Sequence, residues 1–337
     1  MGPNRVPFNL RARMWLKHGL MSFFTRHVPD GRPDILIFST PRSGSTWLME
    51  MLLSQPGYRY CDEPFNLRTA SVRIQLGLQH WDELYRETNL ERLAGYLRGF
   101  SNGRPVHAKL KHVLPASRLY RPVTHAIVFK ILHAGEDRIE WLGQQLNARI
   151  VYLIRHPVPV SLSRRCTPRL ESFIRSEYAR HFRPDQLETA RRVIKEGSAL
   201  EKGVLSWCFQ NAIPLKSRQP HWFVVSYEQL VLQPETVISA MAGSLGLPDP
   251  YRMLSVLNIP STTTWQSDES TRQRIGAAEG GGREWMISKW RRRVNGSEER
   301  RVMELLKLFE IHAYRAGSDT PADALWIGRP AADKGKT

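Results

Sequence analysis

Short apolar segments of strand length, separated by helical patterns, constrain the fold of this chain more than any other feature. The strand candidates are residues 34–38, 126–131, 149–154 and 222–226. The clearest helical patterns are residues 185–216 and 298–315, the second preceded by a turn and cap at Asn295. Strands that alternate with helices predict an α/β domain with a central, mainly parallel sheet. Ligands of such sheets bind beyond the carboxyl ends of the strands, so we expect the functional residues in the loops that follow these segments.

Length and composition predict how the chain is divided. With 337 residues, 41% of them hydrophobic, the chain can build one large domain, and no strong internal linker divides it. We expect an N-terminal extension over residues 1–32, one domain over residues 33–316, and a C-terminal tail over residues 317–337. The tail is rich in Ala, Pro, Gly and charged residues, so we expect it to have little independent structure.

The formal net charge of +17 favours an anionic partner. A nucleic acid, an anionic lipid surface and a highly charged small ligand all fit, and so does a solubilising surface without a partner. The three cysteines, Cys61, Cys166 and Cys208, are widely spaced and form no CxxC pair. This spacing suggests neither a zinc site nor a disulfide framework, and it fits a reducing compartment. Because the sequence shows no transmembrane anchor, we expect a cytoplasmic protein.

Residues 10–24 have the pattern of an amphipathic helix. The basic residues in or next to this segment are Arg11, Arg13, Lys17 and Arg26. Its apolar residues include Trp15, Leu16, Leu20, Phe23 and Phe24. Lys17 and His18 interrupt the apolar stretch, and no run reaches the ~18 apolar residues of a membrane span. Two placements fit this pattern. The helix packs on the domain, or it lies peripherally on an anionic membrane surface.

The loop after the first strand candidate has the features of an anion cradle. It reads Thr-Pro-Arg-Ser-Gly-Ser-Thr over residues 40–46 and leads into a helix. Gly44 permits an unusual backbone angle, and the first amides of the helix favour a bound anion. Arg42 adds a fixed charge with a forked set of donors. The lysine of a Walker A motif is absent, and an ordinary N-cap turn with a surface arginine is the alternative.

A second candidate anion site follows the strand at residues 149–154. Arg155 ends this strand, Pro157 makes a turn, and Ser163 lies early in the next helical segment. An arginine at a strand end and a serine in the following helix can converge on one phosphate, to which the arginine supplies bidentate charge.

Together the two loops resemble the nucleotide-binding elements of the PAPS-dependent sulfotransferase superfamily. The first is similar to its 5′-phosphosulfate loop, and the second to its 3′-phosphate element, where a serine stands eight residues after the arginine, as Ser163 does here. The resemblance covers most of the chain and implies a P-loop-like three-layer α/β/α fold, with PAPS as sulfuryl donor, PAP as product and no metal. The residues that it places on the donor are Arg42, Ser43, Gly44, Ser45, Thr46, Arg155 and Ser163.

Two positions depart from the cytosolic members of that superfamily. Arg42 stands where they carry lysine, and His156 stands where they usually carry aspartate. An arginine in the phosphate loop is typical of tyrosylprotein and many bacterial members. The resemblance is therefore to a bacterial, carbohydrate or tyrosylprotein-like branch.

Other positions resemble the family's donor site less closely. Trp47 stands where cytosolic members stack a tryptophan on adenine, with packing on the first helix as the alternative. Tyr227 resembles a tyrosine that approaches the nucleotide, with packing at a strand end as the alternative. A glycine-rich segment at residues 280–283 and a basic run resemble the loop that closes over the 3′-phosphate. The residues of that run assigned to the donor are Lys289, Trp290 and Arg291.

The resemblance also implies an in-line displacement that depends on positioning, cationic stabilisation and a general base. Arg42 is the candidate that stabilises the leaving group, and Lys130 resembles a lysine that contacts the sulfuryl oxygens; a lysine that extends from the sheet edge to solvent is the alternative. Glu63, 21 residues after Arg42, and His133, close after Lys130, both resemble catalytic bases. The arginine of the phosphate loop and the Lys-Trp order near residue 290 favour Glu63.

The acceptor is not determined by these motifs. We expect a hydroxyl group, or less readily an amine, on a carbohydrate, a glycolipid or a small metabolite, and an anionic acceptor is compatible with the charge. The variable loops, residues 64–125 and 165–200, hold the aromatic residues Trp81, Tyr85, Tyr96, Phe100, Tyr120, Phe173 and Tyr178 among many arginines.

Two other classes of protein share single features with this chain. A P-loop kinase or NTPase shares the cradle, but the chain lacks the Walker lysine and a clear carboxylate ending a strand. A nucleic-acid-binding protein shares the basic charge, but no helix-turn-helix, RRM or zinc signature is present. We therefore expect no nucleic acid among the partners.

Overall fold

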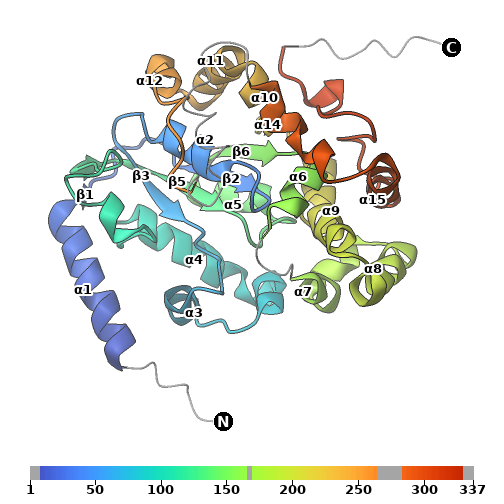
Figure 1. Cartoon of the computed structure of the whole chain (residues 1–337). Coiled ribbons are helices and arrows are strands. Elements are labelled where there is room, and N and C mark those ends of the chain that lie inside the picture. Colours follow the sequence, from blue (N-terminus) through green and yellow to red (C-terminus); the bar gives the residue numbers. More distant parts are fainter. Residues whose placement is uncertain (1–7, 165–168, 264–282, 329–337) are drawn as a thin grey trace.

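The computed structural model describes residues 8–164, 169–263 and 283–328. Five strands form its central sheet, in the order β3 (Tyr58–Asp62), β5 (Ala126–Ile131), β2 (Ile35–Ser39), β6 (Arg149–Ile154) and β7 (Phe223–Ser226). Every neighbouring pair is parallel. Helices flank the sheet (Figure 1). The predicted α/β fold with a mainly parallel sheet is confirmed.

Strand β3 is the one strand of the central sheet that sequence patterns did not reveal. Its sequence is Tyr-Arg-Tyr-Cys-Asp, so Arg59 and Asp62 interrupt the apolar run that marks the other strands. Arg59 is accommodated at the sheet edge because its guanidinium donates to the backbone oxygens of Phe100 and Arg104. The strand pairs with β5 so that Asp62 lies beside Lys130. This register brings the end of β3 to the same edge as the predicted functional loops.

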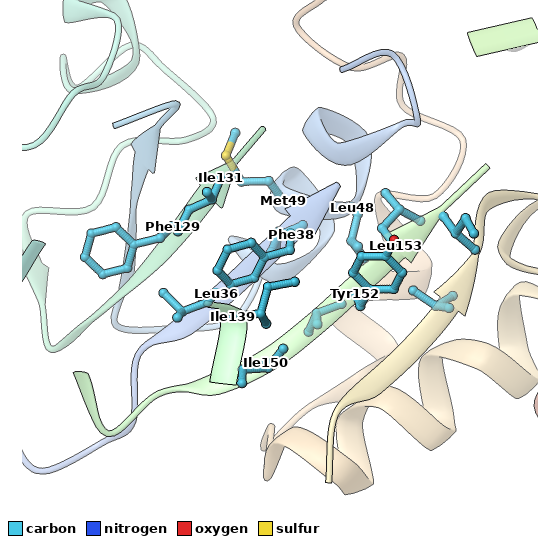
Figure 2. Close-up of a cluster of buried hydrophobic side chains, with 14 of the residues drawn as sticks. Leu36, Phe38, Leu48, Met49, Phe129, Ile131, Ile139, Ile150, Tyr152 and Leu153 are labelled. Carbon is cyan, nitrogen blue, oxygen red and sulfur yellow. The ribbon is translucent and has the colours of Figure 1, made fainter. Parts of the chain in front are cut away.

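The core lies on both faces of the sheet. All residues of β2 and β5 are buried, and since alternate side chains of a strand point to opposite faces, both faces must be covered. Helices α2 (Ser45–Leu52) and α5 (Ile139–Leu146) supply part of the cover. Figure 2 shows Leu48 and Met49 of α2 and Ile139 of α5 gathered with side chains of the central strands. The sheet is therefore a rigid support for the loops at its ends.

The predicted helical stretch at residues 185–216 is two helices, α8 (Pro184–Glu196) and α9 (Ala199–Ser217). They separate at Gly197, and Ser198 begins α9 with a capping box in which its hydroxyl accepts from the amide of Glu201. Helix α15 (Gly296–Leu308) begins at the predicted cap, where the side chain of Asn295 accepts two backbone N–H groups. It ends before the predicted residue 315, at a turn in which Glu310 has a φ of 58°.

The remaining elements connect and cover these layers. The helices are α3 (Ala70–Leu76), α4 (Leu90–Ser101), α6 (Pro157–Leu162), α7 (Leu170–Arg175), α10 (Tyr227–Leu232), α11 (Pro234–Leu245), α12 (Pro250–Ser255) and α14 (Glu284–Ser288). Two short strands, β1 (Arg26–His27) and β4 (Val123–Thr124), form a separate parallel pair. Cys61 and Cys208 are buried free thiols, and Cys166 lies outside the described residues.

The two ends of the chain contact the domain differently. Helix α1 (Phe8–Phe24), which contains the predicted helix at residues 10–24, lies along the outer edge of the molecule (Figure 1, blue). At the other end, the backbone of Ile327 exchanges hydrogen bonds with the side chain of Gln229, and the indole of Trp326 donates to Gln233. Residues up to 328 are thus held against α10 and α11.

Candidate functional site

The carboxyl ends of all five parallel strands lie at one edge of the sheet, and the residues singled out in the sequence follow them. Two contacts join loops that are far apart in the sequence. The ammonium of Lys130, in β5, lies 3.1 Å from the hydroxyl of Thr46, in the loop-helix junction after β2. The guanidinium of Arg155, after β6, donates to the backbone oxygen of Arg42 at 3.1 Å. The structure therefore places these side chains in one connected site.

The loop after β2 has the geometry of an anion cradle. Arg42 and Gly44 both have positive φ angles, of 77° and 91°, which turn the chain sharply before α2 begins at Ser45. The side chain of Ser43 is fully buried and its hydroxyl has no hydrogen-bond partner. Leaving a buried hydroxyl unpaired costs about 1–3 kcal/mol. An oxyanion at the start of α2 would accept its proton together with the free amides of the helix, so a phosphate or sulfate group fits this loop.

Gly44 is required for two reasons. Its φ lies in the region that disfavours a side chain, and a Cβ atom there would lie 2.6 Å from Cδ2 of Tyr227. Tyr227 opens α10 at the end of β7 and therefore forms one wall of the cradle. The tyrosine and the glycine are matched in shape across two loops.

Arg155 is held in place but keeps donor capacity. Its guanidinium carbon lies 3.9 Å from the ring centroid of Tyr227, a cation–π contact. Its Nε atom is buried and has no partner. Ser163, at the end of α6, donates its hydroxyl to the backbone oxygen of Val160 at 2.9 Å. Arg155 is thus preorganised for a ligand, whereas Ser163 has to rotate its hydroxyl to donate to one.

Trp47 and His156 flank this part of the site. The indole of Trp47 donates to the backbone oxygen of Leu257, and its ring meets the ring of Tyr227 edge to face at 6.0 Å. Burial lowers the pKa of His156 to about 3, so its ring is neutral and Nδ1 accepts the amide of Val158 at the start of α6. His156 is therefore a structural residue where the cytosolic branch carries aspartate.

The basic run at residues 289–291 is connected to the site through His156. The ring of Trp290 is buried and stacks on His156 at 4.8 Å. Arg291 forms ion pairs with Asp319 and Glu299, and Lys289 lies over the ring of Trp285. The glycines at residues 280–282 lie outside the described residues. A donor role for these three side chains remains a prediction.

Lys130 lies between the phosphate loop and two carboxylates. Its side chain is only 4% exposed, and its ammonium lies 2.6 Å from Oδ1 of Asp62 and 3.4 Å from Oε1 of Glu63. Burial lowers its pKa, but the two carboxylates outweigh burial and raise the pKa above its usual value. The lysine is therefore charged and points to the site, and it does not extend from the sheet edge to solvent.

Glu63 and His133, the two candidate bases, are in contact. Glu63 has a φ of 48°, and its Oε2 lies 3.6 Å from Nε2 of His133 and accepts from Asn66 at 2.7 Å. Burial raises the pKa of Glu63, but His133, Lys130 and Asn66 together hold it well below its usual value. Burial is also the main reason why the pKa of His133 falls to about 4. At neutral pH the pair is a carboxylate beside a neutral imidazole.

Asp62 and Asn66 are site residues that the sequence did not indicate. Asp62 adjoins Glu63, but its contact with Lys130 depends on the pairing of β3 with β5. Asn66 orients Glu63 from the turn that follows. The only sequence signal for Asp62 was its position directly before the candidate base Glu63, and an acidic residue at such a position often has a purely structural role.

Comparison with known proteins identifies a family. Residues 32–294 match the family model described as sulfotransferase domain. Similar solved structures include the sulfotransferase domain of the Synechococcus PCC 7002 olefin synthase, with 20% identity and a TM-score of 0.39 over 86% of this chain and 97% of that chain. The sulfotransferase domain of the curacin biosynthetic pathway has 17% identity and a TM-score of 0.41 over 85% of this chain and 99% of that chain. A mouse sulfotransferase complexed with PAP has 14% identity and a TM-score of 0.38 over 86% of this chain and 87% of that chain. A comparison with curated proteins found no match.

Proposed function

The chain belongs to the sulfotransferase domain family, and we propose that it transfers the sulfuryl group of PAPS to a hydroxyl group of an acceptor. One observation carries the proposal. The anion cradle with the unpaired hydroxyl of Ser43 is joined, through the contact of Thr46 with Lys130, to a carboxylate that can accept a proton. A donor site for an anion and a base for an acceptor are therefore adjacent.

The donor would be held by residues from three loops. Ser43, Gly44, Ser45 and Thr46 offer backbone amides and hydroxyls to the 5′-phosphosulfate, with Tyr227 as a wall. Arg155 would hold the 3′-phosphate, because its guanidinium is fixed on Tyr227 while Nε lacks a partner. Trp47, whose ring contacts that of Tyr227, would contact the base of the nucleotide.

PAPS, when bound, supplies an activated sulfuryl group. Arg42 stabilises the charge that develops on the departing phosphate oxygen, because preorganised cations act where charge appears. Lys130, which joins Thr46 to Glu63, neutralises the sulfuryl oxygens. When the sulfuryl oxygens share the charge of Lys130, the lysine lowers the pKa of Glu63 less, and the carboxylate becomes a stronger base.

Glu63 accepts the proton of the acceptor hydroxyl. Its side chain is 26% exposed, whereas that of His133 is 7% exposed, so the carboxylate is the member of the pair that an acceptor can reach. His133 then acts as a positioning residue that fixes the carboxylate through Nε2. The pair therefore has one base and one support.

The replacement Arg155→Ala tests the donor assignment. A charge-assisted bidentate contact in a desolvated site is worth about 2–5 kcal/mol, so we expect PAP to bind about 30-fold or more weakly. AMP, which has no 3′-phosphate, should lose far less affinity. Both are measured by calorimetric titration. Arg155→Lys is the matched control, since it keeps the positive charge but cannot make the bidentate contact. Its affinity for PAP should lie between those of the wild type and of Arg155→Ala. Equal losses for PAP and AMP would exclude the assignment.

A further inference from the structure

Three arginines gather on the acceptor side of the site, beside His133. Arg68 and Arg169 lie over the ring of Trp81, with their guanidinium carbons 5.4 and 5.1 Å from its centroid. The ring of Trp81 lies 5.2 Å from the ring of His133. The charges of Arg68 and Arg169 also act on Arg164, the third member. We refer to Arg68, Arg164 and Arg169 as the arginine cluster.

Arg169 has internal partners that account for its charge. Its guanidinium pairs with Glu136 at 2.9 Å and donates to the hydroxyl of Tyr85, which in turn donates to Glu136. The carbon of the same guanidinium lies 4.5 Å from the ring of Phe173. This arrangement is a satisfied, buried structural network.

Arg164 has no such compensation within the part of the chain that the structure describes. It donates to two neutral groups of α9, the hydroxyl of Ser206 at 2.7 Å and Oε1 of Gln210 at 2.8 Å. Its Nε is buried without a partner, and no carboxylate of residues 8–164, 169–263 or 283–328 pairs with it. Burial, with repulsion from Arg169 and Arg68, lowers its pKa to about 9. A guanidinium in this setting is strongly stabilised by an added anion.

Arg164 follows Ser163 in the chain, but its side chain is bound to α9. Its partner Gln210 donates to the backbone oxygen of Leu132, the residue before His133. None of its hydrogen bonds reaches the phosphate loop. Through Gln210 the guanidinium is linked to the strand end that carries His133.

We propose that Arg164, with Arg68 and Arg169 beside it, binds an anionic group of the acceptor, a carboxylate or a sulfate ester, and so orients the acceptor hydroxyl toward Glu63. This inference rests on the proposed sulfuryl transfer and specifies its substrate class. Acidic carbohydrates carry both groups, a hydroxyl and an anion a few ångströms apart. Neutral sugars and simple phenols would leave the charge of Arg164 uncompensated.

Inorganic sulfate tests the anion site without knowledge of the acceptor. The protein is first saturated with PAP to fill the donor site, and its melting temperature is then followed against sulfate and against chloride at equal ionic strength. We expect saturable stabilisation by sulfate in the wild type and in Arg175→Gln, which removes an exposed, paired arginine of α7. Arg164→Gln should lose the saturable component. Equal stabilisation of all three proteins, or none beyond chloride, would overturn the proposal.

A turnover measurement distinguishes this inference from the proposed function. Methyl glucuronide and methyl glucuronamide have the same hydroxyl groups and differ in the charge of the group at C6, so the ratio of their kcat/KM values reports anion recognition. We expect the ratio to exceed 10 in the wild type and to fall close to 1 in Arg164→Gln, while the affinity for PAP stays unchanged. Failure of PAP to bind the wild type would reject the donor site itself. Normal PAP binding with no preference for the glucuronide would reject the anion site alone.

Helix α1 supports a second, independent inference because large apolar side chains cover its outward side. Trp15, Leu16 and Phe23 are 78%, 58% and 82% exposed. The opposite side of the helix faces the protein with Met21 buried and with Lys17 partly buried, and burial lowers the pKa of Lys17. Apolar residues therefore lie on both sides of α1, whereas a helix that only packs on its own domain normally has a polar outer side.

Positive charge accompanies this apolar surface. Arg13 and Arg26 are exposed at either end of the exposed stretch, and Val123, which pairs with Arg26 between β4 and β1, is also exposed. No helix among the described residues is long and apolar enough to cross a membrane. We infer that α1 lies on an anionic lipid surface, with Trp15, Leu16 and Phe23 inserted among the headgroups and the arginines on the phosphates.

Sedimentation with lipid vesicles tests this placement. We expect the full chain to bind vesicles of phosphatidylcholine with phosphatidylglycerol, and to bind pure phosphatidylcholine at least tenfold more weakly. Trp15→Ser with Phe23→Ser should reduce binding at least tenfold, while Tyr251→Ser, an exposed aromatic residue of α12, should not. Unchanged binding in the double variant would overturn the inference. A dimer that the double variant converts to monomer, without vesicle binding, would assign the surface to a second copy of the chain.

Discussion

Replacing Glu63 with glutamine is expected to lower kcat for sulfuryl transfer by about 10²- to 10⁴-fold. Glutamine keeps the size of the side chain, and its one carbonyl oxygen can accept from either Asn66 or Lys130, but it cannot accept a proton at neutral pH. Binding of PAP should be unchanged, because no contact of Glu63 reaches the phosphate loop directly. The rate is measured with radiolabelled PAPS and the best acceptor of a panel of sugars, phenols and glycolipids.

His133→Ala is the informative partner of this variant. His133 supports the carboxylate and helps to hold its pKa down, so its removal should raise the pKa of Glu63. Since the base acts only when ionised, the acidic limb of the kcat profile should move to higher pH, with a smaller loss of maximal rate. If Glu63→Gln turned over almost normally while His133→Ala lost about 10²-fold or more, the histidine would be the base.

The replacement Arg42→Ala should reduce kcat by about 10²- to 10³-fold with a smaller change in the dissociation constant of PAPS. The charge on the leaving oxygen develops only in the transition state, and a guanidinium that meets it there lowers the barrier more than it strengthens binding. The contact of Arg155 with the backbone oxygen of residue 42 does not depend on the side chain, so the second anion contact should survive.

Arg42→Lys is the control for charge without the fork, and it should recover part of the lost rate. The φ of 77° at this position is unfavourable for any side chain, so alanine and lysine share its strain and the comparison isolates the guanidinium. A variant that bound PAPS poorly but turned over normally at saturation would show that Arg42 serves binding and not the chemical step.

The sheet and the donor loops could be predicted from the sequence because their signals are local. Strands β5 and β6 are apolar runs interrupted only by Lys130 and opened by Arg149, a pattern typical of the buried strands of a parallel sheet. The turn at Gly44 and the cap at Asn295 depend on backbone conformation and on hydrogen bonds within a few residues. The order of these elements along the chain was enough to indicate the α/β class and the edge that carries the site.

The convergence of distant side chains could not be predicted in this way. Lys130 meets Asp62 because β3 pairs with β5 in one register, and β3 itself lacked an apolar signal. The sequence presented Glu63 and His133 as alternatives, whereas the fold places them in contact.

The same limit applies to charge and to exposure. Composition indicated a basic chain, but only packing shows that Arg169 has a carboxylate partner while Arg164 is held by neutral groups. The pattern of α1 was amphipathic in either orientation, and tertiary contacts decided that Trp15 faces solvent. Periodicity and local hydrogen bonding determine what an element is, and strand order, register and packing decide which side chains it meets.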